Sequence, residues 1–291
     1  MKVGIQVASF SWPGGDAAAG PMVADIARTA DEVGFDSIWV MDHFFQIPAV
    51  GPADEQMLES YSTLAYMAGV TSRIRLGTLV TGVVYRPPGL LAKIVTTLDV
   101  LSGGRAWLGI GAAWYEREAL GLGLPFPPLG ERLDRLEETL QIVTRMWAGD
   151  RSQYQGRYFE LAEPINSPQA LSKPHPPILI GGAGERRTLR LVAQYGDACN
   201  LIAAMGPDEL TRKLDVLKQH CDAVGRDYAQ IERTVLTFPD LDRQKPAELI
   251  DHCRQLAHLG FQHVIFTATS AFQTDTVRTI GREVIPELAA L

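Results

Sequence analysis

The chain has 291 residues, 46% of them apolar and 21% charged, and its acidic side chains outnumber the basic ones to give a formal charge of −7. This composition predicts a globular protein with a substantial core, and the acidic balance argues against nucleic acid or anionic membranes as partners. The sequence has no run of about 18 apolar residues and no signal-peptide pattern at its start, and its three cysteines are widely spaced. We therefore expect a soluble, cytoplasmic protein with reduced thiols and no membrane span.

Short apolar runs alternate with amphipathic stretches along the whole chain. The predicted strands, most of them nearly continuous in apolar residues, are Lys2–Ala8, Ser37–Met41, Arg75–Val80, Ala106–Ile110, Pro177–Ile180, Ala198–Ile202, Arg233–Thr237 and His263–Thr267. The predicted helices are Pro21–Val33, Tyr61–Thr71, Gly89–Leu101, Glu131–Trp147, Glu185–Tyr195, Asp208–Ala223, Pro246–Leu259 and Thr274–Leu288. This α/β alternation predicts a (β/α)8 TIM barrel, with an open doubly wound sheet as the alternative. A dinucleotide-binding half is disfavoured because the first strand-to-helix loop has no GxGxxG.

Two segments, Phe44–Ser60 and Asp150–Pro176, are too long to be simple connections. Insertions of this length in compact domains are usually lids, binding loops or contact surfaces, and both would help to bury a large ligand. No linker separates domains. We therefore expect residues 1–291 to form a single barrel domain with insertion segments.

The reactive groups of such a barrel lie where the strands end at its C-terminal face. The second predicted strand is followed by Asp42 and His43, and His43 is the only one of six histidines at such a place. An imidazole is well suited to proton transfer near neutral pH. Without a ligand site nearby, a structural role in which the pair holds a loop is slightly favoured.

Small residues follow three other predicted strands. Gly181, Gly182, Ala183 and Gly184 lead into a predicted helix, and this pattern predicts a phosphate site formed by backbone N–H groups and the helix N-terminus, although glycines also form tight turns. The third and fourth strands end in segments 77–82 and 109–114, where small residues leave room for a flat ligand or simply for close packing.

Several kinds of chemistry are disfavoured by what the strand ends lack. No lysine occurs there, which argues against Schiff-base chemistry, and no metal-ligand motif such as HExxH is present. A strand-end face rich in small residues, with one acid–base pair and one anion site, instead favours a barrel that uses an organic cofactor.

Several segments together resemble the luciferase-like monooxygenase superfamily. They are Gly34–Phe44, Leu76–Thr78 with Tyr85–Pro88, Ser102–Arg105 with Leu108–Trp114, and Pro176–Gly184 with Leu189-Arg190 and Gly196-Asp197. The resemblance spans Lys2 to about Asp208. It implies a (β/α)8 barrel that binds FMN or the deazaflavin coenzyme F420. The Asp-His-Phe sequence is more similar to the F420-dependent oxidoreductases, whose relatives are often dimers.

This resemblance implies roles for individual residues. His43 would donate or accept a proton beside the cofactor ring, oriented by Asp42, and the ring would pack against a bulge at Leu79–Val80 that often contains a non-prolyl cis peptide. The phosphate of the cofactor tail would bind the 181–184 loop. The cofactor-binding residues expected are Thr78, Leu79, Val80, Thr81, Gly111, Ala112, Ala113, Trp114, Gly181, Gly182, Ala183 and Gly184. No metal site is expected.

Two departures from the sugar-phosphate dehydrogenases of this branch bear on the substrate. Trp114 replaces their glutamate, and Ala203–Met205 stands where they have a lysine for the substrate phosphate. A sugar phosphate is therefore not expected. Aromatic residues near the strand ends suggest a less polar substrate; they are Phe10, Trp12, Phe44, Phe45 and Trp114.

The function predicted is hydride transfer between F420 and a small organic substrate, with His43 as proton donor or acceptor. Three alternatives stay open: an FMN-dependent monooxygenase, a non-catalytic barrel that binds a flavin or phosphate ligand, and a non-redox isomerase with His43 as base. A homodimer is compatible with the resemblance.

Overall fold

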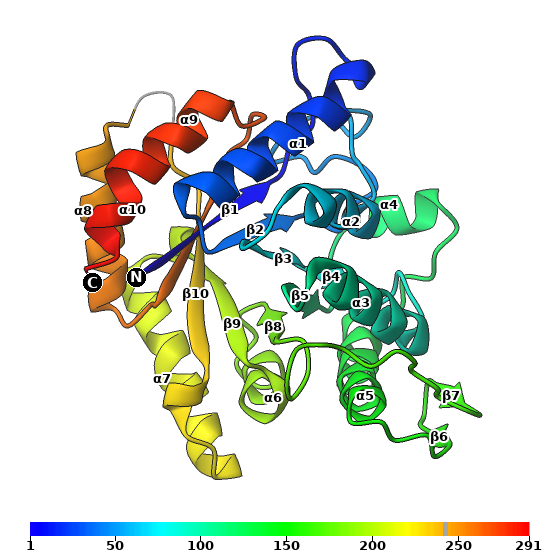
Figure 1. The fold of residues 1–291 in the computed structure, drawn as a ribbon. Helices are drawn as coiled ribbons and strands as arrows, with labels where there is room; N and C mark the ends of the chain where they lie inside the picture. Colours follow the sequence, from blue (N-terminus) through cyan, green and yellow to red (C-terminus); the bar gives the residue numbers. More distant parts are fainter. Residues whose placement is uncertain (241–243, 291) are drawn as a thin grey trace.

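The computed structural model describes residues 1–240 and 244–290, and a closed barrel of parallel strands forms its centre (Figure 1). The barrel strands are β1 (Lys2–Val7), β2 (Ser37–Val40), β3 (Arg75–Thr78), β5 (Ala106–Gly111), β8 (Ile178–Gly181), β9 (Ala198–Ile202), β10 (Glu232–Thr237) and β11 (His263–Thr267). Their order around the sheet is β3-β2-β1-β11-β10-β9-β8-β5, and pairing between β3 and β5 closes the ring. The predicted (β/α)8 barrel is therefore confirmed.

Helices surround the barrel and cover its outer face (Figure 1). They are α1 (Asp16–Val33), α2 (Ser60–Val70), α3 (Pro88–Ser102), α5 (Leu129–Trp147), α6 (Thr188–Tyr195), α7 (Pro207–Val224), α8 (Pro246–His258), α9 (Thr274–Thr279) and α10 (Ile285–Leu288). The shorter elements are β4 (Thr81–Gly82), α4 (Glu116–Gly121), β6 (Tyr154–Gln155), β7 (Glu160–Leu161), η1 (Ala203–Met205), η2 (Tyr228–Gln230) and η3 (Ile280–Val284). None of the helices in the described ranges is both long and apolar enough to cross a lipid bilayer.

The helix predicted over residues 274–288 is interrupted, because five of its residues, η3, form a π-helical turn between α9 and α10. Two local features account for this break. Gly281 packs so closely on α1 that a Cβ atom there would lie 2.2 Å from Cγ2 of Val33. Pro286, in the first turn of α10, has no backbone N–H to continue an α-helical ladder.

The strand predicted over residues 75–80 ends earlier, at Thr78, because the chain turns into the barrel at Leu79 and Val80. The peptide bond between them is cis, as the family resemblance implies. β4 then pairs with β5. Val80 lies against the backbone of two neighbouring strands: a Cβ on Gly111 would come within 2.9 Å of its Cγ2, and one on Gly181 within 2.8 Å of its Cγ1. Larger residues at these positions would displace the turn.

Two indole rings lie in contact inside the barrel. Trp39 and Trp107 meet edge to face with ring centroids 5.9 Å apart. Gly77 makes room for them, since a Cβ there would lie 2.5 Å from Trp39. The interior cluster contains seven buried residues; they are Trp39, Leu79, Trp107, Leu179, Ala198, Leu236 and Ile265. The barrel is therefore a packed core, and ligands must bind at its ends.

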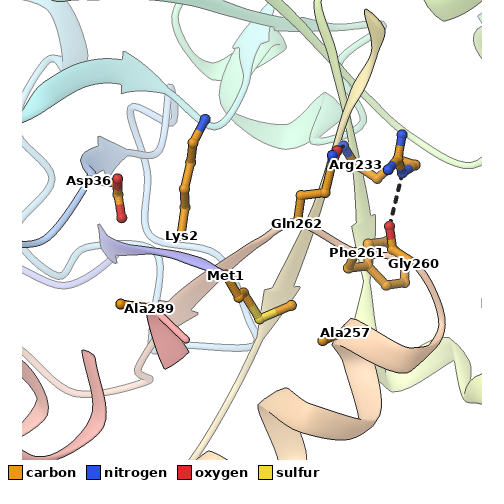
Figure 2. A pocket seen from close by; sticks show the side chains of 9 residues that line it. All are labelled: Met1, Lys2, Asp36, Arg233, Ala257, Gly260, Phe261, Gln262 and Ala289. Carbon is orange, nitrogen blue, oxygen red and sulfur yellow. Dashed lines mark hydrogen bonds between the residues drawn. The ribbon is translucent and has the colours of Figure 1, made fainter. Parts of the chain in front are cut away.

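A polar network occupies the amino-terminal end of the barrel. His263 is bound by Glu232 at Nδ1 (2.8 Å) and by Ser37 at Nε2 (2.9 Å), and Lys2 pairs with Glu232. The hydrogen bonds and charges of His263 and Lys2 lower the pKa of Glu232 to about 2, against the effect of burial. A cavity of 570 Å³ opens here, where Figure 2 shows Arg233 donating to the carbonyl of Gly260. This end is opposite to the one that carries His43.

A substitution at Gly109 would test the close packing beside Val80. A Cβ atom at this position would lie 1.8 Å from the carbonyl oxygen of Thr78. We expect Gly109→Ala to lower the free energy of unfolding by about 3 kcal/mol or more, since backbone must move to relieve the clash. The matched control is Gly69→Ala on the exposed side of α2, where nothing lies within 4 Å of the new methyl group. It should raise stability by up to about 1 kcal/mol. Urea unfolding of both variants measures the difference, and equal midpoints would contradict it.

Candidate functional site

His43 follows β2 at the carboxyl-terminal end of the barrel, and a carboxylate holds its imidazole. Nδ1 of His43 lies 2.6 Å from Oε1 of Glu118 in α4. The side chain of Glu118 is fully buried, whereas that of His43 stays 14% exposed. Within the described residues, no group hydrogen-bonds Nε2 of His43. The imidazole is thus fixed through one nitrogen and available through the other.

The prediction that Asp42 orients His43 is wrong, because Asp42 binds other partners. Its two carboxylate oxygens accept hydrogen bonds from Arg86 (2.8 and 3.0 Å), from the Ser60 hydroxyl (2.6 Å) and from the backbone N–H of Gly82 (3.1 Å). Consecutive residues of an extended segment point to opposite sides, so neighbours in sequence at a strand end rarely face each other. Asp42 therefore anchors the end of β2 to the start of α2, to β4 and to the segment after β4.

The environments of the two carboxylates differ. Burial raises the pKa of Asp42 above its ordinary value, although the charge and hydrogen bonds of Arg86 oppose this. Burial also acts to raise the pKa of Glu118, but the bonds from His43, Tyr85 and the backbone outweigh it and lower the pKa. Glu118 is thus the carboxylate kept ionised beside the imidazole.

Nothing in the sequence distinguished Glu118 from its neighbours. It lies 75 positions after His43, in a short helix that the sequence analysis did not predict, and the exposed Glu116 precedes it by two residues. Burial of one acid among such neighbours follows from how the loop after β5 folds back over β2. Only the tertiary structure shows this contact.

Aromatic rings form a wall beside His43. The Trp114 ring is edge-on to the imidazole at 5.3 Å and stacks on Tyr115 at 5.1 Å. Trp114 is 58% exposed, an unusual position for so large an apolar ring. It follows Ala113, which has a φ of 59°, a left-handed conformation that few non-glycine residues adopt. The turn at Ala113 presents the indole to solvent at the mouth of the barrel.

Two of the aromatic residues predicted to line the substrate site lie in the core instead. Phe10 and Trp12 are 1% and 4% exposed, and the indole N–H of Trp12 donates to the carbonyl of Phe272. Phe44 and Phe45 are half-buried next to His43. The apolar surface near His43 therefore comes mainly from Trp114 and the residues after β2, because Phe10 and Trp12 pack beneath the loops after β1 and β11.

Of the predicted ring-binding residues, the two threonines are internal. The hydroxyl of Tyr61 bonds that of Thr81, which bonds that of Thr78, which donates to the carbonyl of Gly109. All of these side chains are buried. Leu79 and Gly111 are buried as well, while Val80, Ala112 and Ala113 are half-exposed. Their exposed surface offers a small-residue floor between β3 and β5.

The predicted phosphate loop leaves β8 with an accessible backbone. Gly182 and Gly184 are exposed, and Gly182 has a φ of 119°, which favours glycine. The following helix, α6, begins at Thr188 rather than at Glu185, because residues 185–187 form a turn. A cavity of 420 Å³ adjoins the loop; its cationic lining residues are Arg186, Arg187, Arg212 and Lys213.

Glu185 also lines this cavity, where it belongs to an ion-pair cluster. Its carboxylate pairs with Lys213 and Arg212, each at 2.7 Å. The negative charge of Glu185 is therefore offset by cations. Arg186 is exposed and has no ion-pair partner among residues 1–240 and 244–290. Among the described residues, Arg186 is thus the cation of this cavity that is left to an anionic group, beside the exposed backbone of the loop.

The strand order brings these parts together at one end of the barrel. β2, β3, β5 and β8 are consecutive neighbours, so His43, the floor at Val80, Trp114 and the loop 181–184 follow adjacent strand ends. Within the described residues, no group of three or more histidine, cysteine, aspartate or glutamate side chains is arranged to hold a metal ion.

Comparisons with known proteins agree with this arrangement. The model of the luciferase-like monooxygenase family matches residues 1–245. An F420-dependent glucose-6-phosphate dehydrogenase of Kineococcus radiotolerans is 31% identical over 241 residues, which cover 82% of this chain and 69% of the relative.

Two solved structures share the fold at 20% identity. An F420-dependent secondary alcohol dehydrogenase in complex with an F420–acetone adduct has a TM-score of 0.83 and covers 99% of this chain and 98% of its own. A monooxygenase from Streptomyces bottropensis has a TM-score of 0.82 and covers 98% of this chain and 99% of its own. At this identity the likeness concerns the fold alone.

The buried ion pair of Arg86 and Asp42 is expected to contribute to the stability of the fold. Arg86→Met leaves the buried carboxylate without its cation, and we expect it to lower the free energy of unfolding by about 3–5 kcal/mol at neutral pH. This loss of stability should become smaller below about pH 4. There Asp42 is protonated in both the folded and the unfolded state, so its ionisation no longer disfavours the folded state of the variant.

The matched control is Arg28→Met, which removes an exposed pair with Asp25 and should change stability by less than about 1 kcal/mol. Denaturant unfolding at pH 7 and pH 3.5 measures both variants. A loss for Arg86→Met that stays constant with pH would contradict the assignment of its cost to the ionised Asp42.

Proposed function

Because the chain belongs to the luciferase-like monooxygenase family, we propose that it is an oxidoreductase that uses coenzyme F420 to transfer a hydride to or from a small organic substrate. The observation that carries the proposal is His43, on the barrel face that also carries the loop 181–184. Glu118 holds it at one nitrogen, and no group of residues 1–240 and 244–290 hydrogen-bonds the other. The name of the Kineococcus radiotolerans relative supports F420 over FMN as the cofactor.

The residues of this chain fit the two ends of such a cofactor. Exposed backbone at Gly182 and Gly184, with Arg186 beside it, suits the anionic tail. The half-exposed Val80 and Ala112 give a small-residue floor for the ring system. When bound, F420 supplies the site where a hydride is gained or lost. The protein supplies position and the accompanying proton.

His43 is the residue proposed to handle that proton. Its free Nε2 can accept a proton from a substrate hydroxyl or return one to a carbonyl oxygen. The rings of Trp114 and Tyr115 pack against the imidazole, and the side chain of His43 is 14% exposed. Hydride and proton would then leave or reach the substrate together, which corresponds to interconversion of an alcohol and a carbonyl compound.

The substrate is proposed to be less polar than the sugar phosphate named for the Kineococcus radiotolerans relative. Trp114 presents an exposed apolar ring beside His43. Ala203–Met205 form the 3-10 turn η1 after β9 and provide no cation for a phosphate. These features favour an apolar or aromatic alcohol or ketone.

The cofactor proposal predicts that F420 binds the purified protein and that FMN binds at least about tenfold more weakly, in a titration that follows cofactor fluorescence. Gly184→Asp should weaken F420 binding by at least about tenfold, because it places a negative charge where the tail phosphate is proposed to bind. The control Gly69→Asp, at an exposed position of α2, should leave affinity unchanged. Tighter binding of FMN would instead support the monooxygenase alternative, and binding of neither cofactor would contradict the proposal.

The role proposed for His43 predicts that His43→Ala lowers kcat by about 10²–10⁴-fold, because a positioned acid–base group contributes on that order. F420 affinity should change by less than about threefold. Turnover is followed by the absorbance of F420 with a panel of apolar alcohols and ketones. The control His258→Ala removes an exposed imidazole on α8 and should behave like the wild type. Unchanged turnover in His43→Ala would remove His43 from the mechanism.

A further inference from the structure

The carboxylate of Glu118 is surrounded by hydrogen-bond donors. Oε2 accepts from the backbone N–H of Phe44 (2.7 Å) and of Phe45 (3.1 Å). Oε1 accepts from the hydroxyl of Tyr85 (2.5 Å) and lies 2.6 Å from Nδ1 of His43. An ionised carboxylate can only accept hydrogen bonds. Four donors on two oxygens therefore satisfy Glu118 in its charged form without any water.

This arrangement fixes which nitrogen of His43 carries the proton. In a neutral imidazole one nitrogen donates and the other accepts. Nδ1 faces an acceptor at 2.6 Å, so Nδ1 must be the donor, and Nε2 keeps its lone pair. The opposite tautomer would place two acceptors against each other in a buried site, where repulsion is poorly screened.

The position of Glu118 is itself well determined by packing. α4 packs on the segment after β2, since a Cβ on Gly121 would lie 2.9 Å from the ring of Phe45. The hydroxyl of Tyr115, just before α4, reaches the carbonyl of Gln46 (3.4 Å). The same segment that carries Trp114 therefore also carries the carboxylate, and both lie against His43 together.

We propose that Glu118 is the positioning residue of this site, which holds His43 in the Nδ1–H tautomer and leaves Nε2 as the atom that exchanges the proton. Its effect on the tautomer is independent of the cofactor, whereas its effect on turnover rests on the proposed function. Glu118 contacts no reacting atom in this role and acts through the imidazole.

The test is Glu118→Gln, which keeps the shape of the side chain. Its carbonyl oxygen can still accept from the N–H groups of Phe44 and Phe45, but its NH2 group then faces Nδ1. We expect the imidazole to switch to the Nε2–H tautomer. Two-bond ¹⁵N–¹H correlation spectra of the histidine-labelled, cofactor-free protein read the tautomer directly, with His43→Asn assigning the signal.

We also expect Glu118→Gln to lower kcat by about 10²–10⁴-fold, since a histidine in the wrong tautomer cannot serve as the base, and to change KM by much less. The matched control is Glu116→Gln, the same change at an exposed position of the same helix. It should keep both the wild-type tautomer and the wild-type rate.

The outcomes separate this proposal from the proposed function. A wild-type spectrum that shows the Nε2–H tautomer would overturn the role of Glu118 even if the variant fails to fold, and so would an unchanged tautomer in Glu118→Gln. A switched tautomer with undiminished F420-dependent turnover would uphold Glu118 as the residue that sets the imidazole and overturn the role of His43 in the proposed reaction.

Discussion

The close packing of Val80 against the glycines of β5 and β8 is the constraint on which the rest of the site depends. With no side chains at Gly111 and Gly181, the turn after β3 reaches into the end of the barrel and closes it. The glycines at these strand ends therefore make room for the turn at Leu79 and Val80, and not only for a ligand. What remains for a ligand is the surface above Val80, bordered by His43 on one side and the 181–184 loop on the other.

The barrel could be predicted because its strands are buried on both faces and therefore read as continuous apolar runs. Details that depend on one tertiary contact could not. The π turn in residues 280–284 reflects the fit of Gly281 against Val33, which lies far away in sequence. The early end of β3 likewise reflects the space left by glycines on other strands. The local sequence pattern contains no information about these contacts between distant residues.

For the candidate site, the positions of His43 and the glycine loop at one end of the barrel could be predicted because strand ends follow from the fold alone. The sequence pattern could not tell which aromatic residues lie near His43 and which lie in the core. Phe10 and Trp12 have the same place in the pattern as Phe44, but the first two pack under loops that join distant parts of the chain. The partner of His43 was missed for a related reason: Glu118 reaches it from a short helix whose path is set by packing.

The two carboxylates near His43 show why adjacency in sequence misleads at a strand end. Asp42 is next to the histidine but points to the other side of the chain, where Arg86 neutralises a charge that burial disfavours. Glu118 is remote in sequence, yet its surroundings supply four donors and favour its charged form. Opposite environments give similar groups different roles. Asp42 holds the start of the segment that carries His43, and Glu118 holds the imidazole itself at Nδ1.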